Sequence, residues 1–205
     1  MNLSTWKVRS RLTVGFGVVC AMLVLILGIG ANSMRQIKDG MQFLVDDRLP
    51  KIETTSVALA QIDAIAIALR NMMLTQDPAD RQKQVEAIQA AREESSKAFA
   101  LLDKVIVLPK GKELLQQMHD HRNKYSAGQD ALLALIAADK PDEARAYLSS
   151  QLRPVLVAYK NSVNAMIAFQ REAMQASAKD AAETYSGSLS ILVGLGLLSL
   201  ALAAG

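Results

Sequence analysis

An uncharged apolar stretch near the N-terminus constrains this chain more than any other feature. It covers residues 12–31 and reads LTVGFGVVCAMLVLILGIGA, 20 residues without a charged side chain. An α-helix needs about 20 apolar residues to cross the roughly 30 Å of hydrocarbon in a bilayer. Lys7, Arg9 and Arg11 precede the stretch without an acidic residue among them. Because basic residues favour the cytoplasmic side, we expect a cytoplasmic N-terminus at residues 1–11 and the following chain on the far side.

The alternative to a membrane-spanning helix is a cleaved signal peptide. Gly28 and Gly30 place small residues at a spacing that suits cleavage. A signal peptide has an apolar core of only about 7 to 15 residues, so the longer stretch favours an uncleaved transmembrane helix. A second uncharged run, at residues 189–205, reads LSILVGLGLLSLALAAG. We expect residues 187–205 to form a second, truncated transmembrane helix.

Charge, cysteine and histidine content exclude several classes of function. Apart from the three N-terminal cations, the chain carries 20 basic and 20 acidic residues, so its charge does not indicate nucleic-acid binding. Cys20 is the single cysteine, which excludes a disulfide or thiolate metal site within one chain. His119 and His121 are two residues apart, so on a helix they point to nearly opposite sides and cannot share a metal. With neither a phosphate-binding glycine loop nor a nucleophile elbow, we expect no enzyme, no cofactor and no metal site.

Residues 32–186 show a helical pattern, with apolar residues at intervals of three and four and no sustained alternation. Proline and turn residues divide this region into four helices. These cover approximately residues 52–73, 78–107, 112–138 and 141–173. The expected fold class is all-α, an up-down-up-down four-helix bundle flanked by two transmembrane helices. The first helix of the bundle follows the first span and the fourth leads into the second span.

Proline and aspartate mark the expected helix ends. Asp77 should cap the second helix, with a proline at its first position. Residues 139–142 are predicted to be another aspartate cap followed by a proline. Pro109 and Gly111 are expected to turn the chain between the second and third helices. Two prolines lie inside expected helices, where each should kink the helix or mark a local break, namely Pro50 and Pro154.

A layer of small and polar residues is expected at one depth in all four helices. Counting from the membrane-distal ends places Arg122 and Tyr125 level with Arg92 and Tyr159. The first helix should add small neighbours, Ala60, Gln61 and Ala64. Such a layer leaves a cavity with hydrogen-bonding walls, where Arg92 or Arg122 would bind a carboxylate through two hydrogen bonds. The alternative is an ordinary packed seam, with satisfied tyrosine hydroxyls and with arginines that are solvated or paired with acids.

Arg70 marks a second candidate position. It lies six residues from Gln76 at the distal tip. The level of Arg122 is about ten residues deeper, or roughly 15 Å along a helix. One small ligand cannot easily contact both arginines, so the two positions are alternatives.

The order of these features resembles the sensory module of bacterial methyl-accepting chemotaxis receptors of the four-helix-bundle class. The resemblance rests on the basic start and first apolar stretch and ends with the second apolar stretch. Between them come DRLP at 47–50, LRNMM at 69–73, an Asp-Pro pair at 77–78 and LRP at 152–154. The resemblance therefore covers almost the whole chain.

The resemblance implies a homodimeric ligand sensor in the bacterial inner membrane, with its sensor domain at residues 32–186 in the periplasm. A cytoplasmic part would hold a HAMP linker and a methylated signalling hairpin that acts on a histidine kinase through a kinase-adaptor complex. The same bundle also occurs on sensor kinases and cyclases, so the output stays open. In the family's aspartate receptor, arginines hold the ligand between subunits. Arg70 matches one of these positions, and Gln61 and Ala66 stand at the other two.

Two hypotheses for the function follow. The first is a transmembrane chemoreceptor that binds a small organic acid or amino acid in the periplasm and shifts its second span, as the resemblance implies. Its candidate ligand-binding residues are Arg70, Arg92, Arg122, Tyr125 and Tyr159. The second is a structural or protein-partner module, which reads a periplasmic binding protein or a membrane stress signal and holds no small molecule.

Overall fold

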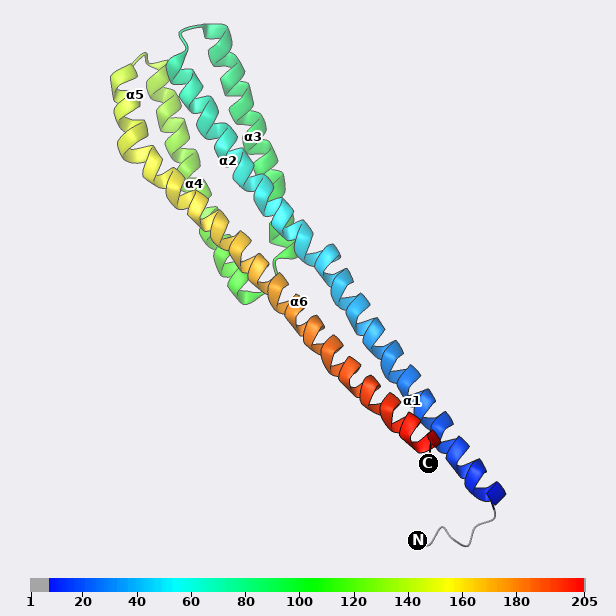
Figure 1. The fold of residues 1–205 in the computed structure, drawn as a ribbon. Coiled ribbons are helices and arrows are strands. Elements are labelled where there is room, and N and C mark those ends of the chain that lie inside the picture. The colour runs from blue at the N-terminus through cyan, green and yellow to red at the C-terminus, as the bar shows by residue number, and fades with distance from the viewer. Residues whose placement is uncertain (1–7, 205) are drawn as a thin grey trace. The chain divides into compact units, whose positions relative to one another are not determined.

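The computed structural model describes residues 8–204, and helices joined by short turns make up this part of the chain. Its α-helices are α1 (Val8–Phe43), α2 (Leu49–Leu74), α3 (Pro78–Val105), α4 (Pro109–Ala137), α5 (Pro141–Tyr147) and α6 (Arg153–Ala204) (Figure 1). The chain divides into two units. One comprises residues 46–173, and the other comprises the residues before 46 and after 173.

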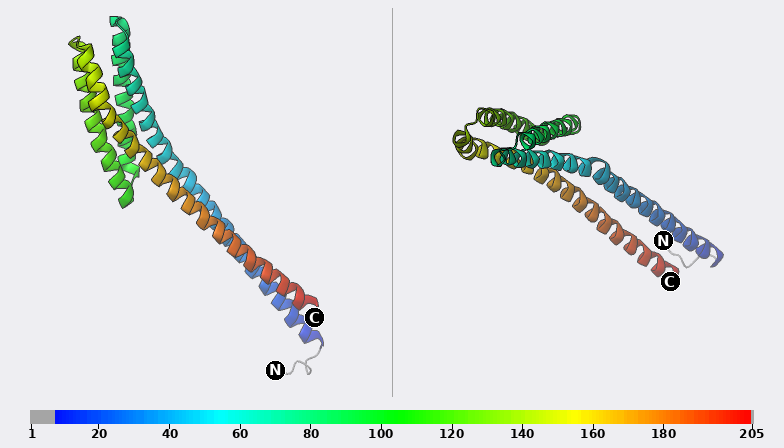
Figure 2. Two further views of the ribbon diagram at one scale, coloured as in Figure 1. Left: turned by 60° about the vertical axis from the view of Figure 1, so that its left-hand side comes forward. Right: turned by 90° about the horizontal axis from the view of Figure 1, so that it is seen from above.

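Residues 46–173 form a four-helix bundle. The chain direction alternates through α2, α3, α4 and the segment that runs from α5 into α6 (Figures 1 and 2). All four contribute side chains to one apolar core, and its most buried members are at most 1% exposed. Among them are Ile62, Leu69, Phe99, Leu102, Met118, Leu132, Val163 and Met166. The predicted all-α, up-down-up-down bundle is therefore confirmed.

The buried seam of α2 repeats every seven residues, as expected for left-handed helix packing. It contains Thr55, Ala58, Ile62, Ile65, Leu69 and Met72. Ala60 and Ala64 are exposed, so the expectation that they face the bundle interior was wrong. The reason is the phase of the repeat, which places Ile62 and Ile65 toward the interior instead.

The predicted cap of α3 is confirmed. A side-chain oxygen of Asp77 accepts a hydrogen bond of 3.0 Å from the amide of Ala79, and Pro78 is the first helical residue. The predicted turn at Pro109 and Gly111 was wrong, because Pro109 is the first residue of α4. Gly111 is buried inside α4, where a Cβ atom would lie 2.8 Å from Cγ2 of Ile106. This glycine serves close packing, not chain reversal.

The prediction of an aspartate cap at residues 139–142 was also wrong. Asp139 ends the preceding helix instead, in a left-handed conformation with φ of 53°. Its amide donates to the carbonyl of Ile136 and the amide of Lys140 donates to that of Leu135, both over 3.1 Å. These bonds satisfy carbonyls that the last turn of α4 leaves free. Pro141 opens α5, as predicted, without a side-chain cap.

A five-residue π-helical turn precedes each of the two internal prolines. These turns are Leu44–Arg48, before Pro50, and Leu148–Leu152, before Pro154. A proline has no amide hydrogen and its ring clashes with the carbonyl four residues earlier. Widening the helix by one residue accommodates both effects. The predicted local breaks are confirmed, and their form is a π-helical turn.

The second unit contains α1 and the C-terminal part of α6. The hydroxyls of Ser33 and Ser188 lie 2.7 Å apart and hydrogen-bond between the two helices, and the Ser199 hydroxyl lies 3.2 Å from the Met22 sulfur. Two helices in the described part are long and apolar enough to cross a membrane. Of the predicted cytoplasmic N-terminus, residues 1–7 lie outside the described part of the chain, as does residue 205 of the second predicted span.

Candidate ligand-binding site

A cavity of about 240 Å³, partly open to solvent, draws its walls from α2, α3, α4 and α6. Four of the five predicted site residues line it: Arg92, Arg122, Tyr125 and Tyr159. The remaining walls are Ile62, Ile65, Ser95, Ser96, Ser126 and Gln129. The cavity therefore combines two guanidinium groups and several hydroxyls with an apolar side formed by α2.

Helical spacing explains why α3 and α4 supply the polar wall. Residues three or four apart lie on one helix face. On α3 this relation joins Arg92 to Ser95 and Ser96, and on α4 it joins Tyr125 to Gln129. Ser95 and Gln129 are only 6% and 2% exposed. Such buried polar groups need partners, either from the protein or from a bound molecule.

The guanidinium of Arg92 is held by two partners on α4. Its Nε donates to the side-chain oxygen of Gln129 over 2.8 Å, and one Nη donates to the carboxylate of Asp130 over 2.7 Å. This fork fixes the Arg92 side chain across α3 and α4. It also gives the positive charge of Arg92 a carboxylate partner.

Arg122 has a different environment. One of its Nη atoms donates to the hydroxyl of Ser96 over 2.5 Å, and its guanidinium carbon lies 4.8 Å from the centre of the Phe99 ring. Within residues 8–204, Arg122 forms no ion pair with an acidic side chain. A hydroxyl and an aromatic face compensate a charge less well than a carboxylate does. Arg122 is thus the cation of the cavity that is open to an anion.

Tyr125 and Tyr159 form the aromatic part of the cavity, with ring centres 5.9 Å apart. Burial raises the pKa of both phenols, that of Tyr159 to about 12. The neighbouring hydroxyl of Ser95 and the charge of Arg122 act in the opposite direction on the pKa of Tyr159. Even so, the buried Tyr159 hydroxyl lacks a hydrogen bond of good geometry to any described residue. It remains a neutral donor in the wall of the cavity.

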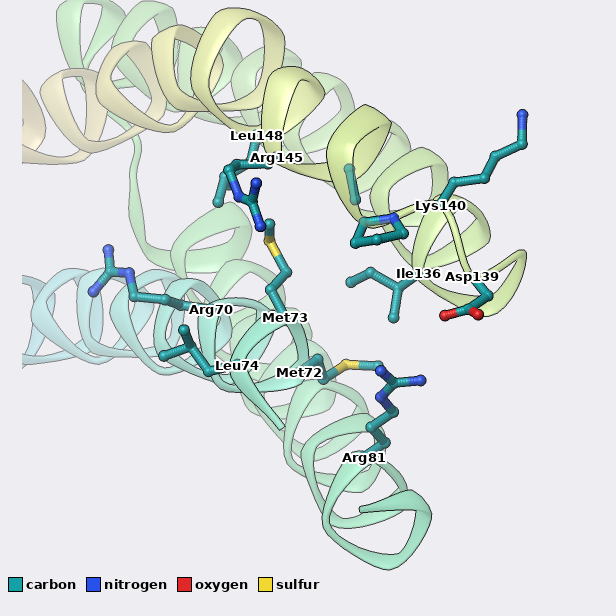
Figure 3. Close-up of a pocket in the computed structure, with 12 residues that line it drawn as sticks. Arg70, Met72, Met73, Leu74, Arg81, Ile136, Asp139, Lys140, Arg145 and Leu148 are labelled. Atoms are coloured by element: carbon teal, nitrogen blue, oxygen red, sulfur yellow. The ribbon is translucent and has the colours of Figure 1, made fainter. Parts of the chain in front are cut away.

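Arg70 does not line this cavity. It lies in a groove of about 490 Å³ together with Arg145, Arg153 and Lys160, and it also borders a pocket at the distal tip. Figure 3 shows that the tip pocket takes its side chains from the end of α2, the start of α3, the end of α4 and α5. The structure thus separates Arg70 from the other four predicted residues, although Tyr125 borders both the groove and the cavity.

A comparison with known families bears on what such a bundle does. The family described as "four helix bundle sensory module for signal transduction" matches residues 5–185. The chain belongs to this family. It therefore contains a sensory module for signal transduction of the kind found in chemotaxis receptors. A comparison with curated proteins found no match.

Several residues of the sensory module's cavity and groove were missed from the sequence. Gln129 and Asp130 hold Arg92, and Arg153 and Lys160 line the groove. The spacing in the sequence could have indicated two of these residues, because Gln129 is seven residues from Arg122 and Lys160 is seven from Arg153. Residues seven apart return to one face of a helix after two turns. The pairing of Arg92 with Asp130 depends on how α3 and α4 meet, which a single sequence does not show.

Proposed function

We propose that this sensory module is the ligand-binding part of a transmembrane chemoreceptor, and that it binds a small organic acid inside its bundle. One observation carries the proposal. Arg122 brings a positive charge to a partly open cavity, and its partners within residues 8–204 are the Ser96 hydroxyl and the Phe99 ring. A carboxylate would form stronger, charge-assisted hydrogen bonds with this guanidinium. The role is binding, not catalysis.

The proposed topology places the bundle in the periplasm and anchors the protein in the bacterial inner membrane by two helices. It is supported by the basic residues before the first apolar stretch and by the two helices that are long enough to span a bilayer. Tyr159 and the second apolar stretch belong to the same helix, α6. A ligand that prefers one of two positions of α6 would shift the population toward that position, and a cytoplasmic kinase-adaptor complex would read the change.

A homodimer is part of the proposal, and an exposed stripe on α2 supports it. The stripe follows intervals of three and four, with one interval of seven before its last member, on the side away from the buried seam. Its members are Val57, Ala60, Ala64, Ile67 and Leu74, all exposed. Small and branched residues at heptad spacing suit the packing of a second helix. We infer that α2 of a second copy covers this stripe.

The groove at Arg70 is the second candidate for the ligand site. Arg145 and Lys160 are paired with Asp142 and Asp63. Arg70 and Arg153 have no acidic partner among the described residues. Two uncompensated cations in one groove favour an anion there, and α2 of a second copy would lie close to it. A ligand at this position would lie between subunits, not inside one bundle.

A thermal-shift screen of the full chain in lipid nanodiscs tests the proposal. A bound acid raises the melting temperature because it binds the folded state alone. We expect at least one small organic acid to do so, and Arg122→Gln to abolish the shift while Arg70→Gln keeps it. The opposite pattern would move the site to the groove. If no small acid or amino acid shifts the melting temperature, the proposal fails and a protein partner becomes the better hypothesis.

A further inference from the structure

We infer that the bundle cavity lined by Arg122 and Tyr159 binds a monocarboxylate with a compact apolar body, and that Arg122 and the Tyr159 hydroxyl hold its carboxylate. The inference rests on the proposed function, because it names the class of acid that the cavity accepts. Three properties of the cavity lead to it: the unequal state of its two arginines, the apolar wall from α2, and the Tyr159 hydroxyl, which lacks a well-formed hydrogen bond to the described residues.

The cavity offers one guanidinium to a ligand, not two. Nε and one Nη of Arg92 already donate to Gln129 and to the Asp130 carboxylate. A ligand carboxylate at the remaining N–H groups of Arg92 would lie near the Asp130 carboxylate, and the repulsion between the two like charges would offset part of the gain. Arg122 has no carboxylate partner among the described residues. It donates to the Ser96 hydroxyl, which itself donates to the Arg92 carbonyl over 2.7 Å, and the remaining N–H groups of Arg122 are available to a ligand. The balance of charges therefore accommodates a single carboxylate.

The hydroxyl of Tyr159 supplies a second donor for the same carboxylate. Tyr159 is 2% exposed and its hydroxyl has no well-formed hydrogen bond to the described residues, although its side chain lines the cavity. Arg122 lies close enough for its charge to lower the pKa of this phenol against the effect of burial. Both side chains line the same cavity. A buried donor without a partner is costly, and a bound carboxylate oxygen would satisfy it.

The opposite wall determines what the rest of the ligand is. Ile62 and Ile65 are 1% and 4% exposed, and the rings of Tyr125 and Tyr159 adjoin them in the cavity lining. No lysine, histidine or further unpaired arginine of the described residues lines this side. The second carboxylate of a dicarboxylic acid would be buried there without a partner, at a large desolvation cost. An apolar body, in contrast, gains from contact with these side chains.

The test compares pentanoate, 3-methylbutanoate and benzoate with glutarate and with pentanamide. Pentanamide keeps the apolar body without the charge, and glutarate adds a second carboxylate at the same chain length. The full chain in nanodiscs is titrated with each compound by calorimetry. We expect at least one monocarboxylate to bind at least about tenfold more tightly than glutarate and pentanamide. Only a monocarboxylate offers one carboxylate to Arg122 and an apolar body to the wall from α2.

Substitutions at cavity residues test whether the monocarboxylate binds in the cavity. Arg122→Gln should weaken monocarboxylate binding by at least about tenfold, and Tyr159→Phe, which removes one donor, by roughly three- to tenfold. Arg70→Gln is the matched control in the groove and should leave the affinity unchanged. The melting temperature of each ligand-free variant shows whether the bundle is still folded.

Two other outcomes would overturn the inference in different ways. If glutarate binds more tightly than the monocarboxylates, and Arg70→Gln abolishes its binding while Arg122→Gln does not, the site is the groove. The proposed function then stands and the inference about the cavity falls. If none of these acids, and no acid or amino acid of the wider screen, binds the chain, the inference and the proposed small-molecule role fail together.

Discussion

The carboxylate of Asp63 on α2 and the ammonium of Lys160 on α6 lie 2.7 Å apart and join two helices of the bundle. Both side chains are more than a third exposed, so solvent screens the pair and its contribution to stability is small. Its position is more informative, since Lys160 lines the groove and the Asp63 charge acts on the nearby Tyr125 phenol. The pair therefore lies beside both candidate sites.

Asp63→Asn should lower the free energy of unfolding by about 0.2–1 kcal/mol, because an exposed ion pair contributes no more than this. The loss should shrink at high salt, which screens exposed charges. Urea unfolding of the full chain in micelles, followed by circular dichroism, measures both values. Lys160→Gln is the matched variant, and the double variant should lose less than the sum of the two single losses. A loss above about 2 kcal/mol would show that the pair is not screened in this way.

Asp77→Ala should destabilise the bundle by about 1 kcal/mol, because the amide of Ala79 loses its acceptor at the start of α3. The control is Asp142→Ala in the first turn of α5, where the side chain is 93% exposed and does not cap the helix. We expect the control to stay within about 0.5 kcal/mol of the parent. Thermal unfolding of the two variants makes the comparison, and equal effects would contradict the assigned cap.

Gly128→Ala should destabilise the bundle, although alanine is the better helix former. A Cβ atom at residue 128 would lie 2.6 Å from Cδ1 of Leu152, which is 2% exposed. Overpacking of this kind costs about 1–3 kcal/mol, against a gain of up to roughly 1 kcal/mol in helix propensity. In a Leu152→Ala background the clash disappears, so Gly128→Ala should become neutral or stabilising there. A double-mutant cycle measures the coupling, and additive effects would rule out the contact.

Stability should fall as the pH rises from about 10 to about 12, and Tyr159 should cause part of this fall. Burial raises the pKa of Tyr159 to about 12 in the folded chain, whereas an unfolded tyrosine ionises near 10. Between these values the folded state binds more protons than the unfolded state, so its stability decreases with pH. Tyr159→Phe should flatten the curve in this window. Tyr185→Phe, at an exposed position, should retain the parent curve.

The helices and most of their ends were predictable, because local chemistry determines them. The side-chain oxygen of Asp77 accepts a hydrogen bond from a backbone amide two residues later, and the next residue is a proline with a fixed φ. Both features determine the start of α3 from within a few residues. Gly111 and Asp139 were misassigned because each residue type has two uses. Glycine permits a turn or a close approach, and aspartate caps the start of a helix or, in the left-handed region, its end. The contact of Gly111 with Ile106, and the hydrogen bond from the Asp139 amide to the Ile136 carbonyl, decide between these uses.

The sequence was enough to predict which side chains lie at the depth of the cavity, but not which of its charged groups are paired. Counting from the helix ends brought Arg92, Arg122, Tyr125 and Tyr159 to one depth, and these four side chains line one cavity. Their unequal roles depend on lateral contacts between α3 and α4. The Asp130 carboxylate reaches Arg92 across 38 positions of sequence, while Arg122, within the described part of the chain, bonds to Ser96 and lies over the Phe99 ring. Such pairings follow from helix rotation, about which a single sequence says little.

The π-helical turn before Pro154 has a practical consequence for alignment and for chimeric receptors. Its five residues, Leu148–Leu152, hold one position more than an ordinary helical path would need. Deleting one of them would let the turn close into an ordinary α-helix, because the π-helical turn takes up the extra residue locally. Tyr159 and Val163 would keep facing the interior, whereas a deletion between Pro154 and Tyr159 would rotate the residues downstream by about 100° and turn these two outward. A relative without this extra position must be aligned with a gap here, and a fusion point is better chosen after it.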